Sequence, residues 1–247
     1  MSIIYKPKGK ALEYSPLAAN LYKGCSHACK YCFAPRITHT DANVFTSPEY
    51  IRPRPNVIEQ LKKDAVKYRG TDKNVLLSFT TDPYQPINDE LGLTREALKI
   101  FNDNNIPVTI LTKGGTRACK DFDILIKNPQ NAFSVTLTTD DPAESFNWEP
   151  GAAPPYSRME SLRIADSQGI KTWVSFEPVI NPDAVIRMIY RTHSYVDLYK
   201  VGKLNYHHKA QTIDWQKFLF RVETELDKFQ KERYIKKDLE AYRNEPR

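Results

Sequence analysis

Short apolar runs alternate with amphipathic helical patterns along most of the 247 residues, and this alternation constrains the fold more than any other feature. Several runs are rich in Val, Ile, Thr and aromatic residues, which is typical of β-strands. The six runs are residues 19–22, 75–80, 108–112, 132–137, 172–176 and 196–201. Strands that alternate with helices pair in parallel, with the helices outside the sheet. We therefore expect an α/β protein, a partial (β/α)6 TIM-like barrel with a C-terminal helical extension.

The chain is expected to divide into three parts around this barrel. Residues 1–17 would be an N-terminal extension, and residues 18–212 the barrel, because no linker or low-complexity stretch interrupts them. Asp214 is a candidate N-cap for a long final helix. Residues 213–247 would then be a C-terminal helix packed on the barrel, followed by a basic tail in which seven basic residues face four acidic ones from residue 228 onward.

Three of the four cysteines, Cys25, Cys29 and Cys32, fall in one short segment directly after the first expected strand. Gly24 allows a tight turn into this segment and Pro35 keeps its exit extended, so the loop can wrap a compact inorganic group. Three thiolates can bind three irons of a cubane iron–sulfur cluster, which leaves the fourth iron without a ligand from this loop. Active sites of α/β barrels gather at the carboxyl ends of the strands, where this loop is expected.

Two other uses of the cysteines remain open at this stage. A structural zinc site would need Cys119, His27 or His39 as its fourth ligand, but zinc sites usually bring two pairs of ligands and the sequence offers no second pair. A disulfide is disfavoured because the first residues lack the apolar core of a signal peptide, so we expect a cytoplasmic protein in a reducing environment. No apolar run is long enough to span a membrane.

The pattern Cys-x3-Cys-x2-Cys, with the aromatic residue Tyr31 before the last cysteine, resembles the signature of radical S-adenosylmethionine enzymes. The resemblance implies a partial β/α barrel and a 4Fe-4S cluster bound by Cys25, Cys29 and Cys32, with S-adenosylmethionine at the open iron. It implies reductive cleavage of S-adenosylmethionine to methionine and a 5'-deoxyadenosyl radical, which abstracts hydrogen from a substrate. An electron donor such as flavodoxin or ferredoxin is then an expected partner.

Polar side chains also mark the next three expected strands. Thr81 and Asp82 follow the second strand, Lys113 follows the third, and Ser134 lies in the fourth. Hydroxyls and a carboxylate suit the ribose and amino groups of a nucleoside ligand, and a lysine suits a substrate carboxylate. Asp-Pro and Lys-Gly-Gly are also common turn and loop sequences, so each signal taken alone has a structural alternative.

Together with the segment Pro-Pro-Tyr-Ser-Arg at residues 154–158, these features resemble the spore photoproduct lyase-like branch of the family, over about residues 18–180. The resemblance implies that Tyr31 lies against the adenine of S-adenosylmethionine. It implies cofactor-binding roles for six residues, namely Tyr31, Thr81, Asp82, Lys113, Ser134 and Arg158. Glu177 also lies at an expected strand end, where a structural role is at least as plausible as contact with a ligand.

One position departs from the pattern of the branch. Spore photoproduct lyase carries a cysteine on its second strand that returns hydrogen to the substrate radical, and Phe79 occupies that position here. A phenyl ring cannot donate hydrogen as a thiol does, so repair of spore photoproduct by the same route is not expected unless another residue takes over. Cys119 and Tyr84 are the candidate catalytic residues for this step; a packed cysteine is the alternative for Cys119.

The net charge of +6 allows a polyanionic substrate. The loop after the sixth strand combines basic and aromatic side chains, a mixture that suits nucleic acid, although a solvated loop would look the same; its members are Lys203, Tyr206, His207, His208 and Lys209. We expect a DNA, RNA or nucleotide substrate. Radical modification of a peptide or protein, and a non-catalytic, metal-stabilised nucleic-acid-binding module, are the alternatives.

Overall fold

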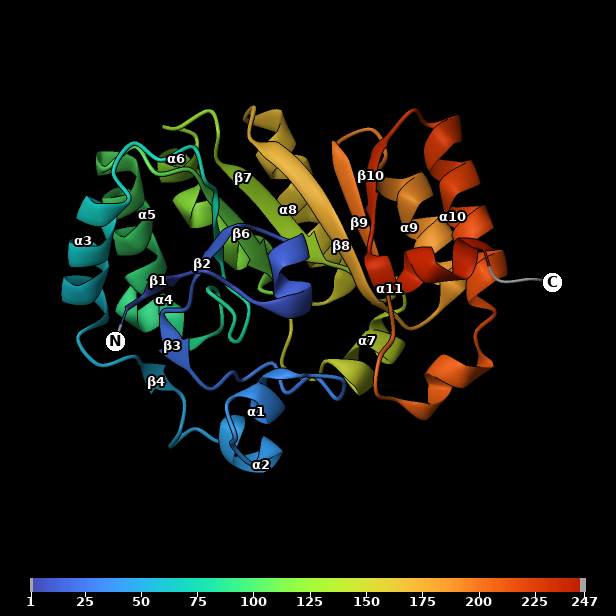
Figure 1. Cartoon of the computed structure of the whole chain (residues 1–247), viewed down its shortest axis with the longest axis horizontal. Helices are drawn as coiled ribbons and strands as arrows, with labels where there is room; N and C mark the ends of the chain where they lie inside the picture. The colour runs from blue at the N-terminus through green and yellow to red at the C-terminus, as the bar shows by residue number, and fades with distance from the viewer. Residues whose placement is uncertain (1, 245–247) are drawn as a thin grey trace.

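The computed structural model describes residues 2–244 and contains one large, mostly parallel β-sheet covered by helices on its outer face (Figure 1). The strand order is β1-β2-β5-β6-β7-β8-β9-β10; β1 is antiparallel to β2, and every other pair is parallel. The strands are β1 (Ile4–Tyr5), β2 (Leu17–Ala19), β5 (Val75–Leu77), β6 (Val108–Thr112), β7 (Ala132–Thr136), β8 (Lys171–Val179), β9 (Leu198–Lys203) and β10 (Glu232–Ile235). The expected α/β partial barrel is therefore confirmed, with β2 and β5 to β9 as its six strands.

Five longer helices cover the outer face, with α3 and α5 over one end of the sheet and α9 and α10 over the other (Figure 1). They are α3 (Val57–Lys67), α5 (Leu93–Asp103), α8 (Pro155–Ser167), α9 (Pro182–Thr192) and α10 (Trp215–Lys228). The shorter helices are α1 (Ala34–Ile37), α2 (Ala42–Phe45), α4 (Ile87–Leu91), α6 (Phe122–Leu125), α7 (Pro142–Trp148) and α11 (Lys237–Glu240), and the 3-10 segments are η1 (Gly9–Glu13), η2 (Gly115–Asp121), η3 (His208–Thr212) and η4 (Ala241–Asn244). No helix within residues 2–244 is long and apolar enough to cross a membrane.

The two faces of the barrel strands carry different kinds of side chain. Ile110 on β6, and Phe133 and Val135 on β7, are fully buried in the core between sheet and helices. Successive side chains of a strand point to opposite faces, so Thr109 and Ser134 point into the barrel. Polar groups can therefore line the interior of the barrel while the outer core stays apolar.

The first expected strand differs from the observed one. Residues 19–22 were expected to pair, but β2 ends at Ala19, and β3 (Tyr22–Lys23) pairs instead with β4 (Arg52–Pro53) in a separate two-stranded sheet. The reason lies in Asn20, whose Oδ1 accepts the backbone N–H groups of Phe79 and Thr80. These side-chain hydrogen bonds replace the backbone ladder, so the chain leaves the large sheet before it enters the cysteine loop.

Both ends of the described chain take part in the sheet. Asp214 is the N-cap of α10 as predicted, because its Oδ1 accepts the N–H of Lys217 at 2.9 Å. After α10 the chain forms β10, a strand that the sequence did not predict, on the edge provided by β9. The last residues of the predicted basic tail, 245–247, lie outside the described residues, as does Met1. The division into three parts stays a prediction.

Candidate active site

The cysteine loop, residues 25–32, lies between β3 and α1, beyond the carboxyl ends of the barrel strands (Figure 1). Cys25 and Cys29 are half-buried, whereas Cys32 is exposed. Burial raises the pKa of all three thiols, and that of Cys29 to about 12. The thiolates that bind metal therefore form in this loop only when positive charge compensates them.

Two glycines allow the loop to follow its path. Gly24 has a φ of +69°, and a β-carbon there would lie 2.7 Å from the carbonyl oxygen of Phe45. Gly151, between α7 and α8, leaves no room for a β-carbon, because it would overlap the carbonyl oxygen of Ser26. The N–H of Gly151 also donates to the carbonyl oxygen of His27 at 3.1 Å. The cysteine loop is thus packed backbone to backbone against the segment that joins α7 to α8.

Asp82 connects three parts of the site. Its Oδ1 accepts the N–H of Tyr84 at 2.8 Å and the hydroxyl of Thr112 at 2.6 Å, and its Oδ2 accepts the N–H of Lys113 at 2.7 Å. His27 Nδ1 lies 3.4 Å from the same Oδ2. Asp82 is buried, so these contacts join the ends of β5 and β6 to the cysteine loop.

The middle of the cysteine loop contains buried polar atoms that lack partners. His27 is only 2% exposed, and burial lowers its pKa to about 4, so its ring is neutral at neutral pH. His27 Nε2 and Ser26 Oγ are buried and make no hydrogen bond to any of residues 2–244. Gln85, which sequence reasoning missed, positions the backbone here: its Oε1 accepts from Ser26 N at 3.0 Å, and its Nε2 donates to Gly24 O at 3.3 Å. No sequence pattern marks a glutamine for this role.

Lys113, which directly follows β6, brings a cation to the aromatic residue of the loop. Its Nζ lies 5.7 Å from the centroid of the Tyr31 ring. Burial lowers the pKa of Lys113, but Cys29 and Glu149 raise it more strongly, so that it stays above the ordinary value. Lys113 therefore favours its charged form beside Tyr31, and this charge interacts with Cys29.

A buried ion pair holds Tyr31 in place. Glu149 accepts a very short hydrogen bond from the Tyr31 hydroxyl, and its Oε2 lies 2.6 Å from Nη1 of Arg158. Both charged side chains are about 1% exposed. Arg158 also donates to the carbonyl oxygens of Ala153 and Thr136 at 2.7 and 3.1 Å. Arg158 thus acts on the loop through Glu149, a residue that sequence reasoning missed, and its expected direct contact with the cofactor stays a prediction.

The expected hydroxyls lie at different depths of the barrel. Thr81 is buried next to Asp82, and its carbonyl oxygen accepts from Ser78 Oγ at 2.5 Å. Ser134 is fully buried on β7 and donates to the carbonyl oxygen of Ile110 at 2.5 Å. Both hydroxyls remain expected, untested cofactor contacts.

The two candidate hydrogen donors lie on the outer side of the barrel mouth. Cys119, in η2, is half-buried against the apolar core, and burial raises its pKa to about 11. Tyr84 is buried in the same core, and its hydroxyl donates to Asp121 Oδ2 at 3.1 Å. The structure does not group either side chain with the three-cysteine loop, and their catalytic roles stay predictions.

The surroundings of Phe79 contain a polar group that the sequence did not reveal. The Tyr14 ring lies edge-on to the Phe79 ring, with 5.8 Å between centroids. The Tyr14 hydroxyl donates a very short hydrogen bond to Glu177, whose Oε2 also lies 2.9 Å from Lys236 Nζ. Tyr14 and Lys236 come from the two ends of the chain, which is why no local pattern signals this cluster.

These residues fit an iron–sulfur cluster with a polar organic ligand. Three thiols lie in one loop, the Lys113 charge compensates thiolate, and the unpartnered Ser26 and His27 atoms are available to a bound group. Within residues 2–244, no three His, Cys, Asp or Glu side chains are arranged to hold a single metal ion. Of the other ligands that a zinc site would require, Cys119 lies in η2 and His39 is exposed.

A barrel with a three-cysteine loop at its mouth is the arrangement of an iron–sulfur enzyme, and comparison with known proteins gives the family. Residues 19–195 match the model of the Radical SAM superfamily, so the chain belongs to that superfamily. Its cofactors are a 4Fe-4S cluster and S-adenosylmethionine, as the cysteine pattern implied.

The relatives extend this assignment. An uncharacterized protein of Mycobacterium tuberculosis is 28% identical over 179 residues, which cover 70% of this chain and 52% of the relative, so the chain spans about half the length of such relatives. The Radical SAM Nalpha-GlyT isomerase of Pseudomonas phage M6 is 23% identical over 156 residues, covering 63% of this chain and 31% of that protein. Spore photoproduct lyase, in a structure with bound AdoMet and dinucleoside spore photoproduct, superposes with a TM-score of 0.71 at 14% identity over 94% of this chain and 78% of that one. The fold expected from the resemblance is therefore confirmed.

Proposed function

We propose that this protein is a radical S-adenosylmethionine enzyme that abstracts hydrogen from a nucleic acid or nucleotide and thereby repairs or modifies it. The observation that carries the proposal is the meeting of the three-cysteine loop with Lys113 and Asp82 at one mouth of the barrel. The solved structure of spore photoproduct lyase with a dinucleoside ligand supports the choice of a nucleic-acid substrate. The net charge of +6 agrees with it.

The cluster, with S-adenosylmethionine on its open iron, would supply one-electron reductive cleavage and a carbon radical that takes hydrogen from the substrate. Cys25, Cys29 and Cys32 would hold the cluster, and Lys113 would offset the charge of the thiolates. Asp82 would hold Lys113 next to the cysteine loop, because it accepts the N–H of Lys113 and lies 3.4 Å from His27 Nδ1. An electron donor such as flavodoxin or ferredoxin would approach from the side on which Cys32 is exposed.

Tyr31 would present a fixed ring to the adenine, because Glu149 and Arg158 restrain its hydroxyl. Thr81, Ser134 and Arg158 remain the other proposed contributors to the cofactor site. The final hydrogen donor differs from the cysteine of spore photoproduct lyase, because Phe79 has no transferable hydrogen of that kind.

The test is anaerobic reconstitution with iron and sulfide, followed by dithionite and S-adenosylmethionine. We expect 5'-deoxyadenosine to form, and the Cys29→Ala variant to lose both the product and most of its iron. Cys119→Ala is the matched control, because it removes the one cysteine outside the loop, and its iron and sulfide content should equal that of the wild type. A reconstituted wild-type protein with zinc instead of iron and sulfide, or with no 5'-deoxyadenosine, would contradict the proposal.

A further inference from the structure

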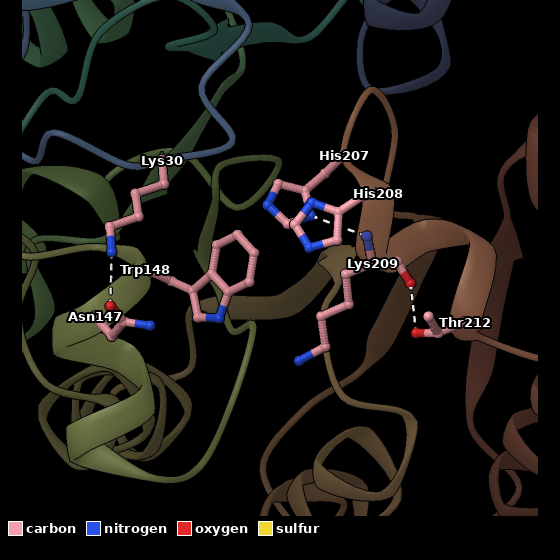
Figure 2. A pocket seen from close by; sticks show the side chains of 7 residues that line it. All are labelled: Lys30, Asn147, Trp148, His207, His208, Lys209 and Thr212. Carbon is pink, nitrogen blue, oxygen red and sulfur yellow. Dashed lines mark hydrogen bonds between the residues drawn. The ribbon is translucent and has the colours of Figure 1, made fainter.

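A pocket of about 360 Å3 opens beside the cysteine loop, in the space between the loop, α7 and the segment after β9 (Figure 2). Lys30 comes from the loop, Asn147 and Trp148 come from the end of α7, and His207, His208 and Lys209 follow β9. Three elements that are far apart in the sequence therefore build one concave site. The cofactor and cluster roles assigned above do not use this pocket; of its lining, only the segment after β9 carries an earlier expectation, contact with nucleic acid.

The pocket shares a wall with the candidate active site. Lys30 N donates to the carbonyl oxygen of Trp148 at 2.9 Å, which attaches the end of α7 to the cysteine loop. The Trp148 ring lies 6.4 Å from the Tyr31 ring, so one indole separates the pocket from the residue before Cys32. A molecule in the pocket would thus contact Lys30 of the cysteine loop, with the Trp148 indole between it and Tyr31.

The walls of the pocket combine aromatic rings with cations. His207 packs edge-on against Trp148 at 4.8 Å between centroids, and the His208 ring lies 4.3 Å from His207. The His207 Nδ1 accepts the N–H of Lys209 at 3.1 Å, which fixes the ring and leaves Nε2 for a ligand. Figure 2 shows the two histidine rings beside the Trp148 indole. These rings already pack on one another, so a planar base would stack on the ring faces that their mutual contacts leave free.

The charge of the pocket is positive. The lining contains two lysines and no acidic residue. Lys30 Nζ donates to the neutral Asn147 Oδ1 at 2.6 Å, and Lys209 Nζ lies 3.6 Å from the nearest carboxylate, that of Glu144. Burial and the neighbouring His208 and Lys209 lower the pKa of His207, which disfavours a positive charge on that ring. The charge of the two lysines matches a phosphate group.

The volume of the pocket favours a single strand over a duplex. A volume of about 360 Å3 is at the small end of ligand sites, large enough for one nucleotide and too small for a duplex. Tyr206, 84% exposed and with Arg36 4.9 Å above its ring, adds a second stacking surface just outside the pocket. Successive aromatic and basic groups of this kind track a single strand, in which the bases are free to stack on protein.

We propose that this pocket binds one nucleotide of a single-stranded nucleic-acid substrate, adjacent to the nucleotide that reacts; this rests on the function proposed above. Trp148 and the two histidines contact the base, and Lys30 and Lys209 contact the phosphate. An acidic peptide would satisfy the lysines but would leave the three rings without a planar partner, which is why nucleic acid is the better match.

The test is binding of a short fluorescent single-stranded oligonucleotide by the reconstituted enzyme, measured by anisotropy across a salt series. A double variant, His208→Ala with Lys209→Gln, should weaken binding by about tenfold or more and lower the slope of log affinity against log salt by about 0.7. The assay is run with DNA and with RNA oligonucleotides of the same sequence, and the one that binds more tightly identifies the type of nucleic acid that the pocket prefers. The matched control is Lys99→Gln on α5, an exposed lysine on a helix away from the pocket, which should leave affinity and slope unchanged.

Several outcomes would overturn the assignment. The first is an oligonucleotide affinity of the double variant equal to that of the wild type. The second is binding of a duplex or of a polyglutamate peptide by the wild type as tight as its binding of the single strand. The third is a loss of S-adenosylmethionine affinity in the double variant, which would show that the pocket serves the cofactor. Iron and sulfide content and the melting temperature verify that the variant is folded. Formation of 5'-deoxyadenosine without added oligonucleotide tests the proposed function separately, so failure of the pocket and failure of the enzyme assignment are distinguishable.

Discussion

The Arg158–Glu149 ion pair offers the sharpest test of how this site is held together. Its two side chains are about 1% exposed and 2.6 Å apart, and Glu149 in turn restrains Tyr31. Arg158→Met keeps much of the side-chain volume but leaves the Glu149 carboxylate buried without its main partner. Breaking a buried pair from one side costs about 3–5 kcal/mol. For a chain of this length the melting temperature should then fall by about 6–20 °C.

The same variant should introduce a dependence of stability on pH that Glu149 does not give the wild type between about pH 7 and pH 5.5. Burial raises the pKa of Glu149, but Arg158 and Lys113 lower it more, so in the wild type it lies below its ordinary value. Glu149 then contributes stability at any pH above its unfolded pKa, and this contribution is constant between about pH 7 and pH 5.5. In Arg158→Met burial dominates and raises the pKa. The folded variant binds a proton more tightly than the unfolded chain, so it should become more stable as the pH falls over this range.

Thermal unfolding at about pH 7 and about pH 5.5 measures both effects. The matched control is Arg163→Met on the same helix, whose partner Glu160 is exposed, and exposed pairs contribute less than about 1 kcal/mol. Equal melting temperatures for the two variants, or a loss of stability of Arg158→Met on mild acidification, would refute the reasoning.

Two further substitutions test other parts of the barrel. Burial lowers the pKa of Lys200 to about 8, below that of an unfolded lysine, so the wild type should gain stability as the pH rises from about 8 to 10. Lys200→Met should abolish this gain and should raise the free energy of unfolding at pH 7 by about 1–3 kcal/mol, as measured by denaturant unfolding. A Lys200→Met variant less stable than the wild type would contradict the conclusion that burial of this charge is costly. Gly151→Ala should displace Ser26 and lower the iron and sulfide content after reconstitution. The control is Gly70→Ala, because Gly70 has a φ of +68° and a β-carbon there would meet nothing within 4 Å. This variant should lose about 1–2 kcal/mol of stability and keep the iron and sulfide content of the wild type. Equal losses of iron and sulfide in the two glycine variants would exclude a local effect of Gly151 on the loop.

The sequence by itself determined the features that depend on local pattern. The period-two runs in β6 and β7 and the Asp214 cap of α10 can be predicted because each depends on neighbours within one element. The cysteine spacing likewise belongs to one loop, and it led to the correct superfamily. Residues that follow strands, such as Asp82 and Lys113, could be placed at one mouth because parallel strands end on the same side.

Only the tertiary structure decided which distant side chains complete the site. Tyr31 and Glu149 are 118 positions apart, and Tyr14 and Glu177 are 163 apart, so no window of sequence contains both partners. The strand β10 pairs with the open edge of β9. Its four residues, Glu-Arg-Tyr-Ile, form a run too short to predict a strand without that edge. The sequence therefore determined where the cysteine loop lies and to which superfamily the chain belongs. Buried hydrogen bonds and ion pairs, which exist only after the barrel has closed, decided how its aromatic residue is held and which pocket lies beside it.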